Sequence, residues 1–425
     1  MSGTSPFAHR DFRLLLFGQT ASQFGAQISA VAVPMLAVLT LHASPLQLGL
    51  INASSTLAFA LLSLPAGAWL DRVPLRPVLT ATDAVRALLL LAVPIAAWCG
   101  RLDITQLVVV ALLAGVARVF FDVGYQGYLP SVLGTGQVLA GNSAMETARA
   151  AGQFAGPGLG GWLIGLIGAA DVVGVQAVTF AVSALSLLLI RTRRAPSPQP
   201  RERRGLTRQV REGLAFVVHD RVLRAVAVTS AMSNFAFAVS SAVTMIFLTR
   251  MLGLSPSLVG LVVGAGSIAA MAGAAMTPRL SRRWGSARVV WLALAVTGPV
   301  TLVGPAAQPG WRTGLAVVAG MAGELGQIVY AITNLSLRQV LCPGHLLSRV
   351  NATMRFVILG LAPLGALVGG AMAEAVGIRA TLFAAQALIV AAPLPVYLAL
   401  RRTREMSDLA NERLQQEHQP VPCTE

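Results

Sequence analysis

Long apolar runs recur along the whole chain, and short polar stretches separate each run from the next. An α-helix rises about 1.5 Å per residue, so about 20 apolar residues cross the hydrocarbon core of a bilayer. The runs predict an all-α integral membrane protein with twelve transmembrane helices in two pseudo-symmetric six-helix bundles. The expected spans are 13–39, 46–70, 78–98, 105–125, 143–168, 171–190, 223–248, 256–277, 288–307, 313–333, 352–376 and 379–400, of which 223–248 and 313–333 are least uniformly apolar.

One long polar interruption divides the chain. Residues 191–205 are rich in Pro, Ser and Arg, which is typical of a linker rather than a spanning helix. After it, apolar positions at helical spacing over 206–217 predict an amphipathic helix on the membrane face, although an ordinary hydrophilic approach to the next span explains them equally well. The expected division is a bundle at 1–190, a linker at 191–221, a bundle at 222–400 and a tail at 401–425.

Composition and charge agree with a membrane protein. Hydrophobic residues form 55% of the chain and charged residues only 12%, whereas a soluble protein carries roughly a quarter charged residues. The net charge of +15 does not indicate a nucleic-acid partner, because the arginines cluster in alternate loops. The other set of loops holds only Arg101, Arg250, Arg312 and Arg379. By the positive-inside rule we expect both termini to be cytoplasmic and the protein to lie in the inner cell membrane.

The two halves repeat each other. A charged turn at 67–76, GAWLDRVPLR, is matched about 210 residues later by 278–288, PRLSRRWGSAR. A second repeated pattern runs through 132–142 and 340–351. Tandem six-helix repeats with the substrate held between them near the midplane are typical of secondary transporters.

The turn at 67–76 has the pattern Gly-x3-Asp-Arg-x3-Arg after a second apolar run, and so resembles a signature of the major facilitator superfamily. Residues 122–161 and 337–370 resemble the branch that includes the enterobactin exporter and the macrolide efflux pumps. The resemblance covers essentially the whole chain and implies efflux by alternating access. It does not specify a substrate.

The resemblance assigns conformational gating to the turn itself. It implies that Asp71, after Gly67 and before Arg72, faces the 352–376 helix and helps to close the cytoplasmic side. The positive N-terminal end of that helix would then point at Asp71. We expect Arg72 and Arg76 to pair with acidic groups or lipid phosphate, although Arg72 fits a plain positive-inside residue as well. Pro74 replaces the glycine that is usual in the pattern, which predicts a stiffer turn.

The 143–168 helix carries a small-residue cluster that resembles the antiporter signature of drug efflux proteins. Its glycines allow close helix packing, and its proline removes a backbone donor and bends the helix. We expect the cluster to act in gating, whereas the alternative is plain glycine packing. The cluster comprises Gly152, Gly156, Pro157, Gly160 and Gly161.

Asp83 and Arg86 lie three residues apart, so they share one face of the 78–98 helix. This spacing allows an intrahelical ion pair. A structural lock beneath the charged turn is the favoured reading, with a role in transport as the alternative.

A stripe of amides indicates the substrate pathway. Gln19, Gln23 and Gln27 follow an i, i+4, i+8 spacing, and three amides on one face of a spanning helix must face protein or a wet cavity. The 223–248 helix offers Asn234 and Phe237 on a comparable polar face. We expect these residues to line the substrate cavity, and interhelical hydrogen bonding is the alternative.

Three charges lie deep within predicted spans. Arg118 and Glu324 are expected near the midplane, and Asp122 follows Arg118 by one helical turn. A carboxylate that has a cationic partner in only one conformation changes its proton affinity during a transport cycle. We expect Glu324, Arg118 and Asp122 to couple transport to protons, while the alternative is that Glu324 binds a cationic substrate.

No catalytic or cofactor signature accompanies these features. The sequence has no nucleophile elbow, phosphate-binding loop or metal-ligand set, and Cys99, Cys342 and Cys423 lie far apart. We therefore expect a monomeric transporter without cofactor or enzymatic activity, whose partners are a small amphipathic substrate, protons and the lipid bilayer. The alternatives are an importer or uniporter of the same fold, and a sensor or scaffold that does not transport.

Overall fold

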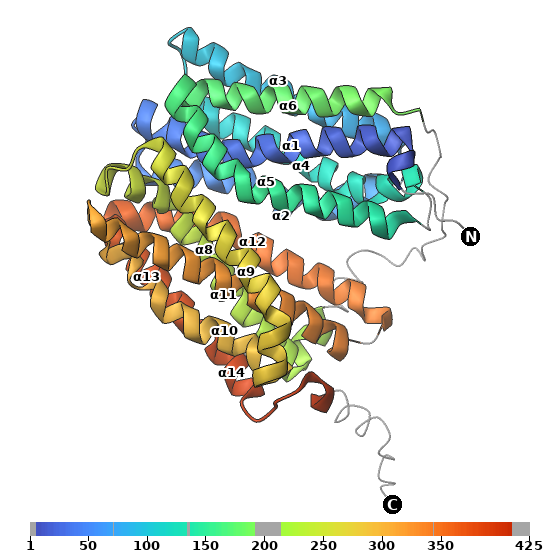
Figure 1. Cartoon of the computed structure of the whole chain (residues 1–425), viewed down its shortest axis with the longest axis vertical. Coiled ribbons are helices and arrows are strands. Elements are labelled where there is room, and N and C mark those ends of the chain that lie inside the picture. The colour runs from blue at the N-terminus through green and yellow to red at the C-terminus, as the bar shows by residue number, and fades with distance from the viewer. Residues whose placement is uncertain (1–5, 71, 134–136, 192–213, 343, 410–425) are drawn as a thin grey trace, which may run out of the picture.

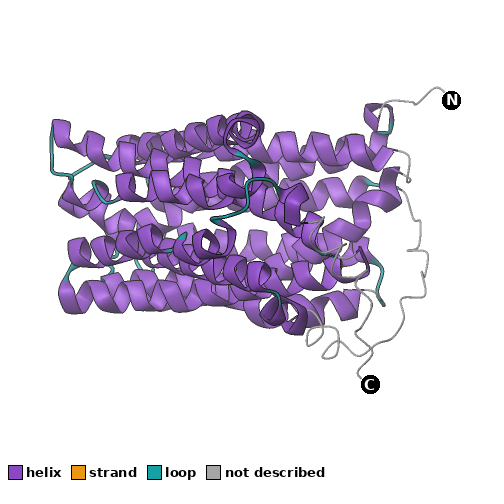
Figure 2. Ribbon diagram, turned by 90° about the horizontal axis from the view of Figure 1, so that it is seen from below, coloured by secondary structure: helices purple, strands orange, loops and turns teal. Residues whose placement is uncertain are grey.

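The computed structural model describes residues 6–70, 72–133, 137–191, 214–342 and 344–409. Every secondary-structure element in these ranges is a helix (Figure 2). The first half begins with the short helix η1 (Pro6–Ala8), and the π-helical segment η2 (Leu36–Thr40) continues its first long helix. The long helices are α1 (Arg10–Met35), α2 (Pro45–Leu70), α3 (Leu75–Trp98), α4 (Ile104–Leu133), α5 (Val138–Ile167) and α6 (Ala169–Leu189).

The second half repeats this arrangement after the linker. Its first helix also ends in a π-helical segment, η4 (Phe247–Met251), and two short helices, η5 (Gly304–Ala306) and η6 (Trp311–Thr313), lie in one loop. The remaining helices are α8 (Arg221–Ile246), α9 (Pro256–Trp284), α10 (Ser286–Thr301), α11 (Gly314–Leu341), α12 (Gly344–Val376), α13 (Ile378–Ala391) and α14 (Leu394–Leu400).

Eleven helical segments in the described ranges are long and apolar enough to cross a membrane. The predicted count of twelve is close to this number. The predicted span that is absent from this count corresponds to α5. This helix has 30 residues, but its first part contains polar residues and its second part contains many glycines. Because α5 packs along α1 and α9, it lies among the spanning helices rather than outside them.

Several helix boundaries differ from the predicted spans. Helices α4 and α12 extend to Leu133 and back to Gly344, because hydropathy marks where the hydrocarbon ends and not where the helix ends. The last predicted span is broken between α13 and α14, where Pro393 and Pro395 interrupt the backbone bonding. Most of the predicted amphipathic helix at 206–217 lies outside the described residues, and its described part, 214–217, belongs to a helical turn that continues to residue 219.

Tight glycine turns occur at equivalent places in the two halves. Gly168 joins α5 to α6 with φ of 87°, and Gly377 joins α12 to α13 with φ of 91°. A side chain rarely tolerates this left-handed region, so glycine is required for a connection this short. The two halves therefore repeat the same glycine turn at the level of the backbone.

The helices form two bundles that lie side by side, α1–α6 in one and α8–α14 in the other (Figure 1). Within the first bundle α1 packs against α5 and α6, and within the second α8 packs against α12 and α13. The bundles meet through two equivalent helix pairs, α2 with α12 and α5 with α9. We call the end of the molecule where α1 begins and α6 ends the terminal end, and the other end the distal end.

Candidate transport cavity between the bundles

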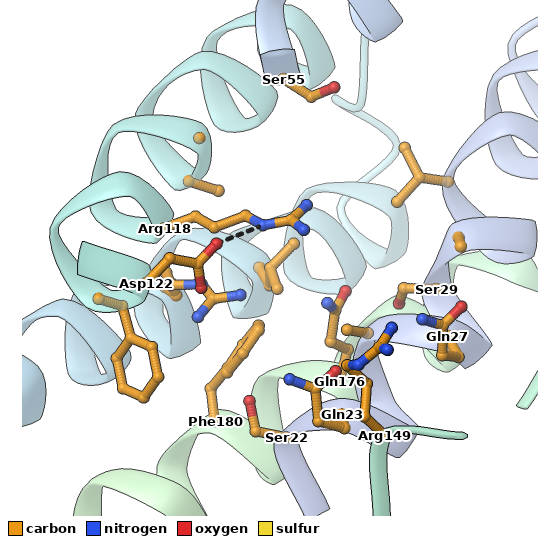
Figure 3. A pocket seen from close by; sticks show the side chains of 18 of the residues that line it. Ser22, Gln23, Gln27, Ser29, Ser55, Arg118, Asp122, Arg149, Gln176 and Phe180 are labelled. Atoms are coloured by element: carbon orange, nitrogen blue, oxygen red, sulfur yellow. Dashed lines mark hydrogen bonds and ion pairs between the residues drawn. The ribbon is translucent and has the colours of Figure 1, made fainter. Parts of the chain in front are cut away.

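A cavity of about 970 Å³ lies against the first bundle. Its wall comes from helices α1 to α6, and Arg355 of α12 is the second bundle's contribution among the described residues. Polar and charged side chains gather on two sides of this space (Figure 3). The α1 residues of the lining come from the middle and end of that helix, whereas the start of α5 and the end of α4 also line the cavity, so it extends towards the terminal end.

Glycine contacts hold the bundles together towards the distal end. A Cβ added to Gly161 of α5 would lie 2.9 Å from Cα of Gly260 in α9. The equivalent contact joins α12 to α2, where a Cβ on Gly370 would lie 2.9 Å from Cα of Leu46 and one on Gly49 would lie 2.6 Å from O of Ala366. Real Cβ atoms do not approach that closely, so both interfaces require glycine for backbone contact.

Two charged side chains of the second bundle also reach across at the distal end. Nη2 of Arg250 donates to the backbone O of Val38 over 3.0 Å, at the π-helical end of α1. Glu374 of α12 accepts hydrogen bonds from the hydroxyl of Ser44 and, over 3.3 Å, from N of Leu46 at the start of α2. Together they hold both ends of the α1–α2 connection.

The predicted amide stripe lies on the cavity wall. Gln19, Gln23 and Gln27 of α1 all line the cavity, as does Gln176 of α6 (Figure 3 labels Gln23, Gln27 and Gln176). Nε2 of Gln19 also donates to the hydroxyl of Ser183 over 3.4 Å, which joins α1 to α6. The amide stripe therefore both lines the cavity and forms an interhelical hydrogen bond.

The corresponding residues of α8 are not part of this cavity wall. Nδ2 of Asn234 donates to the backbone O of Ser230 over 2.8 Å, and Phe237 is 54% exposed. Their assignment to the substrate cavity stays a prediction.

The second bundle instead contains a buried polar network that sequence reasoning missed. The hydroxyls of Ser230 and Tyr330 lie 2.7 Å apart, and Nδ2 of Asn334 donates to Oγ of Ser230 over 3.2 Å. The Tyr330 hydroxyl also contacts the backbone O of Val226 at 3.2 Å. The sequence signal was present as one tyrosine and one asparagine four residues apart in an apolar run, but their partner lies a hundred residues away.

Asp83 and Arg86 form the ion pair that their spacing allows, with Oδ1 and Nη1 3.3 Å apart. Asp83 is fully buried, while Arg86 is 9% exposed and lines the cavity. The guanidinium carbon of Arg86 lies 3.7 Å from the ring centroid of Phe180, which is a close cation–π contact. The pair thus reaches from the bundle core to the cavity wall.

Arg118 and Asp122 face the cavity one helical turn apart on α4 (Figure 3). Nε of Arg118 and Oδ2 of Asp122 lie 3.4 Å apart, and their side chains are 66% and 38% exposed. Arg118 and Glu324, which were both expected near the midplane, do not pair with each other in this conformation. Glu324 packs against α9, where a Cβ on Gly266 would lie 3.1 Å from its Cγ, and it forms no ion pair within the described ranges.

The turn at 67–76, for which gating stays a prediction, is described except for Asp71, which lies outside the described residues. Gly67 faces α4, with Val123 the nearest side chain, and Arg72 is exposed. Arg76 was expected to meet an acidic group or lipid phosphate, but its Nε and Nη2 donate to the backbone O atoms of Leu187 and Leu188 over 2.9 and 2.5 Å. These are the last carbonyls of α6, which have no partner within the helix, so Arg76 caps that helix.

The glycine cluster of α5 contacts two different helices. Gly152 and Gly156 face Gln23 and Gln27 of α1, and a Cβ on Gly160 would lie 2.7 Å from O of Ile28 in the same helix. In contrast, the O of Pro157 and Gly161 contact α9 in the other bundle. The cluster therefore joins the amide-bearing helix to the interface between bundles.

Two helical bundles related by an internal repeat, with a cavity beside their interface, define a transporter of the major facilitator type. The sequence profile of the transmembrane secretion effector family matches residues 1–422, and the chain belongs to this family of the major facilitator superfamily. The match covers both bundles and the linker.

The chain is similar to proteins that carry a functional name. It is 31% identical over 410 residues to the multidrug efflux pump Tap of Mycolicibacterium fortuitum, covering 94% of this chain and 97% of that protein. It is 28% identical over 417 residues to the multidrug efflux pump Tap of Mycobacterium tuberculosis, covering 93% of this chain and 94% of that protein.

Solved structures show the same fold at low sequence identity. A bacterial homologue of the iron transporter ferroportin in an inward-facing state has a TM-score of 0.75 at 17% identity, with 91% of this chain and 98% of that chain covered. The nucleoside transporter NupG has a TM-score of 0.73 at 13% identity, with 92% and 98% covered. At these identities the likeness concerns the fold alone.

Proposed function

We propose that this protein is a secondary active efflux transporter that exports small amphipathic molecules, such as an antibiotic, a siderophore or another secondary metabolite, by alternating access. The observation that carries the proposal is the near full-length similarity to pumps named for multidrug efflux. The polar cavity beside the bundle interface supplies the site that such a pump needs. A sensor or scaffold of the same fold would not require a cavity lined by polar and charged side chains.

The orientation follows from the arginines. They concentrate in the loops and termini of the terminal end, so we place that end in the cytoplasm and the protein in the inner membrane. The cavity then extends to the cytoplasm, while the glycine contacts and the Arg250 and Glu374 bonds close the outer side. This is the conformation from which an exporter takes up its substrate.

We further propose that inward proton flow drives export, with Glu324 as the coupling carboxylate. Glu324 lies within a spanning helix, where an ionised acid costs roughly 2.5–3.5 kcal/mol on insertion scales. It has no ion-pair partner among the described residues in this conformation, so a proton is the simplest way to lower that cost. The proposal includes a single-chain transporter that binds no nucleic acid and has no enzymatic activity.

The direct test uses purified protein in vesicles of known orientation. A susceptibility panel in a pump-deleted host first selects a transported compound, and its uphill movement is then measured with an imposed pH gradient. The proposal is supported if the compound moves uphill in the export direction only when the pH gradient is present. Movement only down the compound's own concentration gradient, or only in the import direction, contradicts efflux. Glu324→Gln should abolish uphill transport but keep downhill exchange.

A further inference from the structure

Arg86 is a buried cation that nevertheless lines the cavity. It is 9% exposed, and its orientation is fixed by Asp83 on one side and by the ring of Phe180 on the other. Phe121 of α4 lies 5.9 Å from the guanidinium carbon. A guanidinium carries five N–H donors in a rigid fork, and the pairing with Asp83 engages only one of its nitrogens. In the described part of the chain no other protein group accepts from this fork, so part of it is available to the cavity.

Arg118 adds a second cation on the same wall. It precedes Phe121 by three residues on α4, so one helical turn separates it from the ring beside Arg86. Its bond to Asp122 is long and exposed to solvent, and such pairs contribute little free energy. Arg118 can therefore exchange Asp122 for another anion at small cost.

The charge balance of the wall is positive. Two carboxylates, Asp122 and Glu146, line the cavity against four arginines, Arg86, Arg118, Arg149 and Arg355. Asp83, which is buried behind the cavity wall, neutralises Arg86, and the wall still carries an excess of positive charge. A cleft with one sign of charge and low-dielectric walls concentrates molecules of the opposite sign.

We infer that Arg86 and Arg118 form an anion-binding subsite, and that the exported molecule is an amphipathic organic acid. An acidic group such as a carboxylate or enolate would accept charge-assisted hydrogen bonds from the two guanidinium groups. The aromatic or apolar body would lie beside Tyr125 of the same wall, because the rings of Phe121 and Phe180 are buried. The inference rests on the proposed efflux function and specifies its substrate class.

The test compares two xanthene dyes of similar size and opposite charge, carboxyfluorescein and rhodamine 123. Their binding to the purified full-length protein is measured by fluorescence anisotropy at constant ionic strength. Carboxyfluorescein should bind about tenfold more tightly than rhodamine 123. Arg118→Gln should weaken carboxyfluorescein binding roughly tenfold to hundredfold, as expected for a lost charge-assisted contact.

Arg149→Gln is the matched control. Arg149 also lines the cavity, and its Nη2 lies 2.6 Å from Oε2 of Glu146, so the variant removes an equal charge from the same space. Because Arg149 contributes to the positive charge of the wall but is not part of the subsite, the variant should weaken carboxyfluorescein binding clearly less than Arg118→Gln does.

Arg86 itself needs a compensated variant, because removing it alone leaves Asp83 buried without its partner. The double variant Asp83→Asn, Arg86→Gln should fold, as judged by a single symmetric peak in size-exclusion chromatography. It should lose carboxyfluorescein binding as Arg118→Gln does. Arg86→Lys keeps the charge without the fork and should give an intermediate loss.

Four outcomes would overturn the inference: tighter binding of rhodamine 123, equal binding of the dyes, no binding of carboxyfluorescein, or equal losses in the Arg118 and Arg149 variants. The efflux proposal is judged separately in cells. Export of rhodamine 123 by cells that express the wild-type protein, without carboxyfluorescein binding, would leave efflux standing and remove the anion subsite.

Discussion

The glycine contact between α5 and α9 can be tested by adding one methyl group. In Gly161→Ala the new Cβ would lie 2.9 Å from Cα of Gly260 and closer still to the backbone O of Pro256. Neither neighbour is a flexible side chain, so the bundles must separate. Overpacking of this kind costs about 1–3 kcal/mol. If the contact breaks in the alternate conformation, the equilibrium shifts towards that conformation by roughly fivefold to hundredfold.

Gly158→Ala is the matched control. Gly158 lies on the same helix, three residues away, and an added Cβ there meets no atom within 4 Å. Both substitutions replace glycine by alanine within a helix, which favours the helical state by about 1 kcal/mol. The difference between the two variants therefore isolates the steric overlap at the interface.

Spin labels at Arg101 and Trp311 would report the separation. Both residues lie in distal loops, one in each bundle, and Trp311 is 85% exposed. In a cysteine-free background, pulsed electron paramagnetic resonance should show a longer label–label distance for Gly161→Ala and an unchanged one for Gly158→Ala. Identical distance distributions in wild type and Gly161→Ala would refute the reasoning, because the bundles would then tolerate the methyl group without opening.

Three further predictions concern other contacts. Tyr330→Phe removes the hydroxyl bonded to Ser230, so the thermal unfolding temperature in detergent should fall with a loss of about 1–3 kcal/mol; an unchanged temperature would show that the network contributes nothing. Glu374→Ala removes the acceptor for Ser44 across the distal end, and the same pair of spin labels should show a larger open population than in wild type. Hydrogen bonds from Oγ and N of Ser286, over 2.7 and 3.1 Å, lower the pKa of Glu405, so the docking of the tail is strongest above the ordinary carboxylate pKa and weakens as pH falls through the lowered value. Hydrogen-exchange protection of 401–409 should decline on acidification in wild type, and Glu405→Gln should be weakly protected at every pH.

The sequence predicted features that depend on local pattern. Run length marked the spans because hydrocarbon thickness fixes how many apolar residues a helix needs. The amide stripe of α1 followed from helical periodicity, and the structure places Gln19, Gln23 and Gln27 on the cavity. The ion pair of Asp83 and Arg86 followed from a spacing of three residues. Each of these depends on neighbours within a few turns of one helix.

Features that depend on distant partners were not predictable in this way. Arg76 could bind an acid, a lipid or a carbonyl, and only the packing of α3 on α6 brings the carbonyls of Leu187 and Leu188 within reach. Arg250 read as a lone positive charge in a distal loop, yet it binds the backbone O of Val38 in the other bundle. A charged side chain has many acceptable partners, and tertiary contacts decide among them.

The two halves repeat their packing but not their chemistry. Gly160 and Gly161 of α5 correspond to Gly369 and Gly370 of α12, and in both pairs the first glycine meets its own bundle while the second meets the other. Equal contacts at both interfaces suit a rocking motion, because each interface can open and close on the same small residues.

The polar side chains divide differently between the bundles. Those of α1, α3 and α4 line the cavity, whereas Ser230, Tyr330 and Asn334 hydrogen-bond to one another inside the second bundle. Arg86 is oriented entirely by neighbours in its own bundle, Asp83 and Phe180, so rocking of one bundle against the other leaves its geometry intact. A binding wall carried by one rigid bundle therefore keeps its shape in both conformations. The other bundle then has to supply only the movement and, through Glu324, the proposed response to protons.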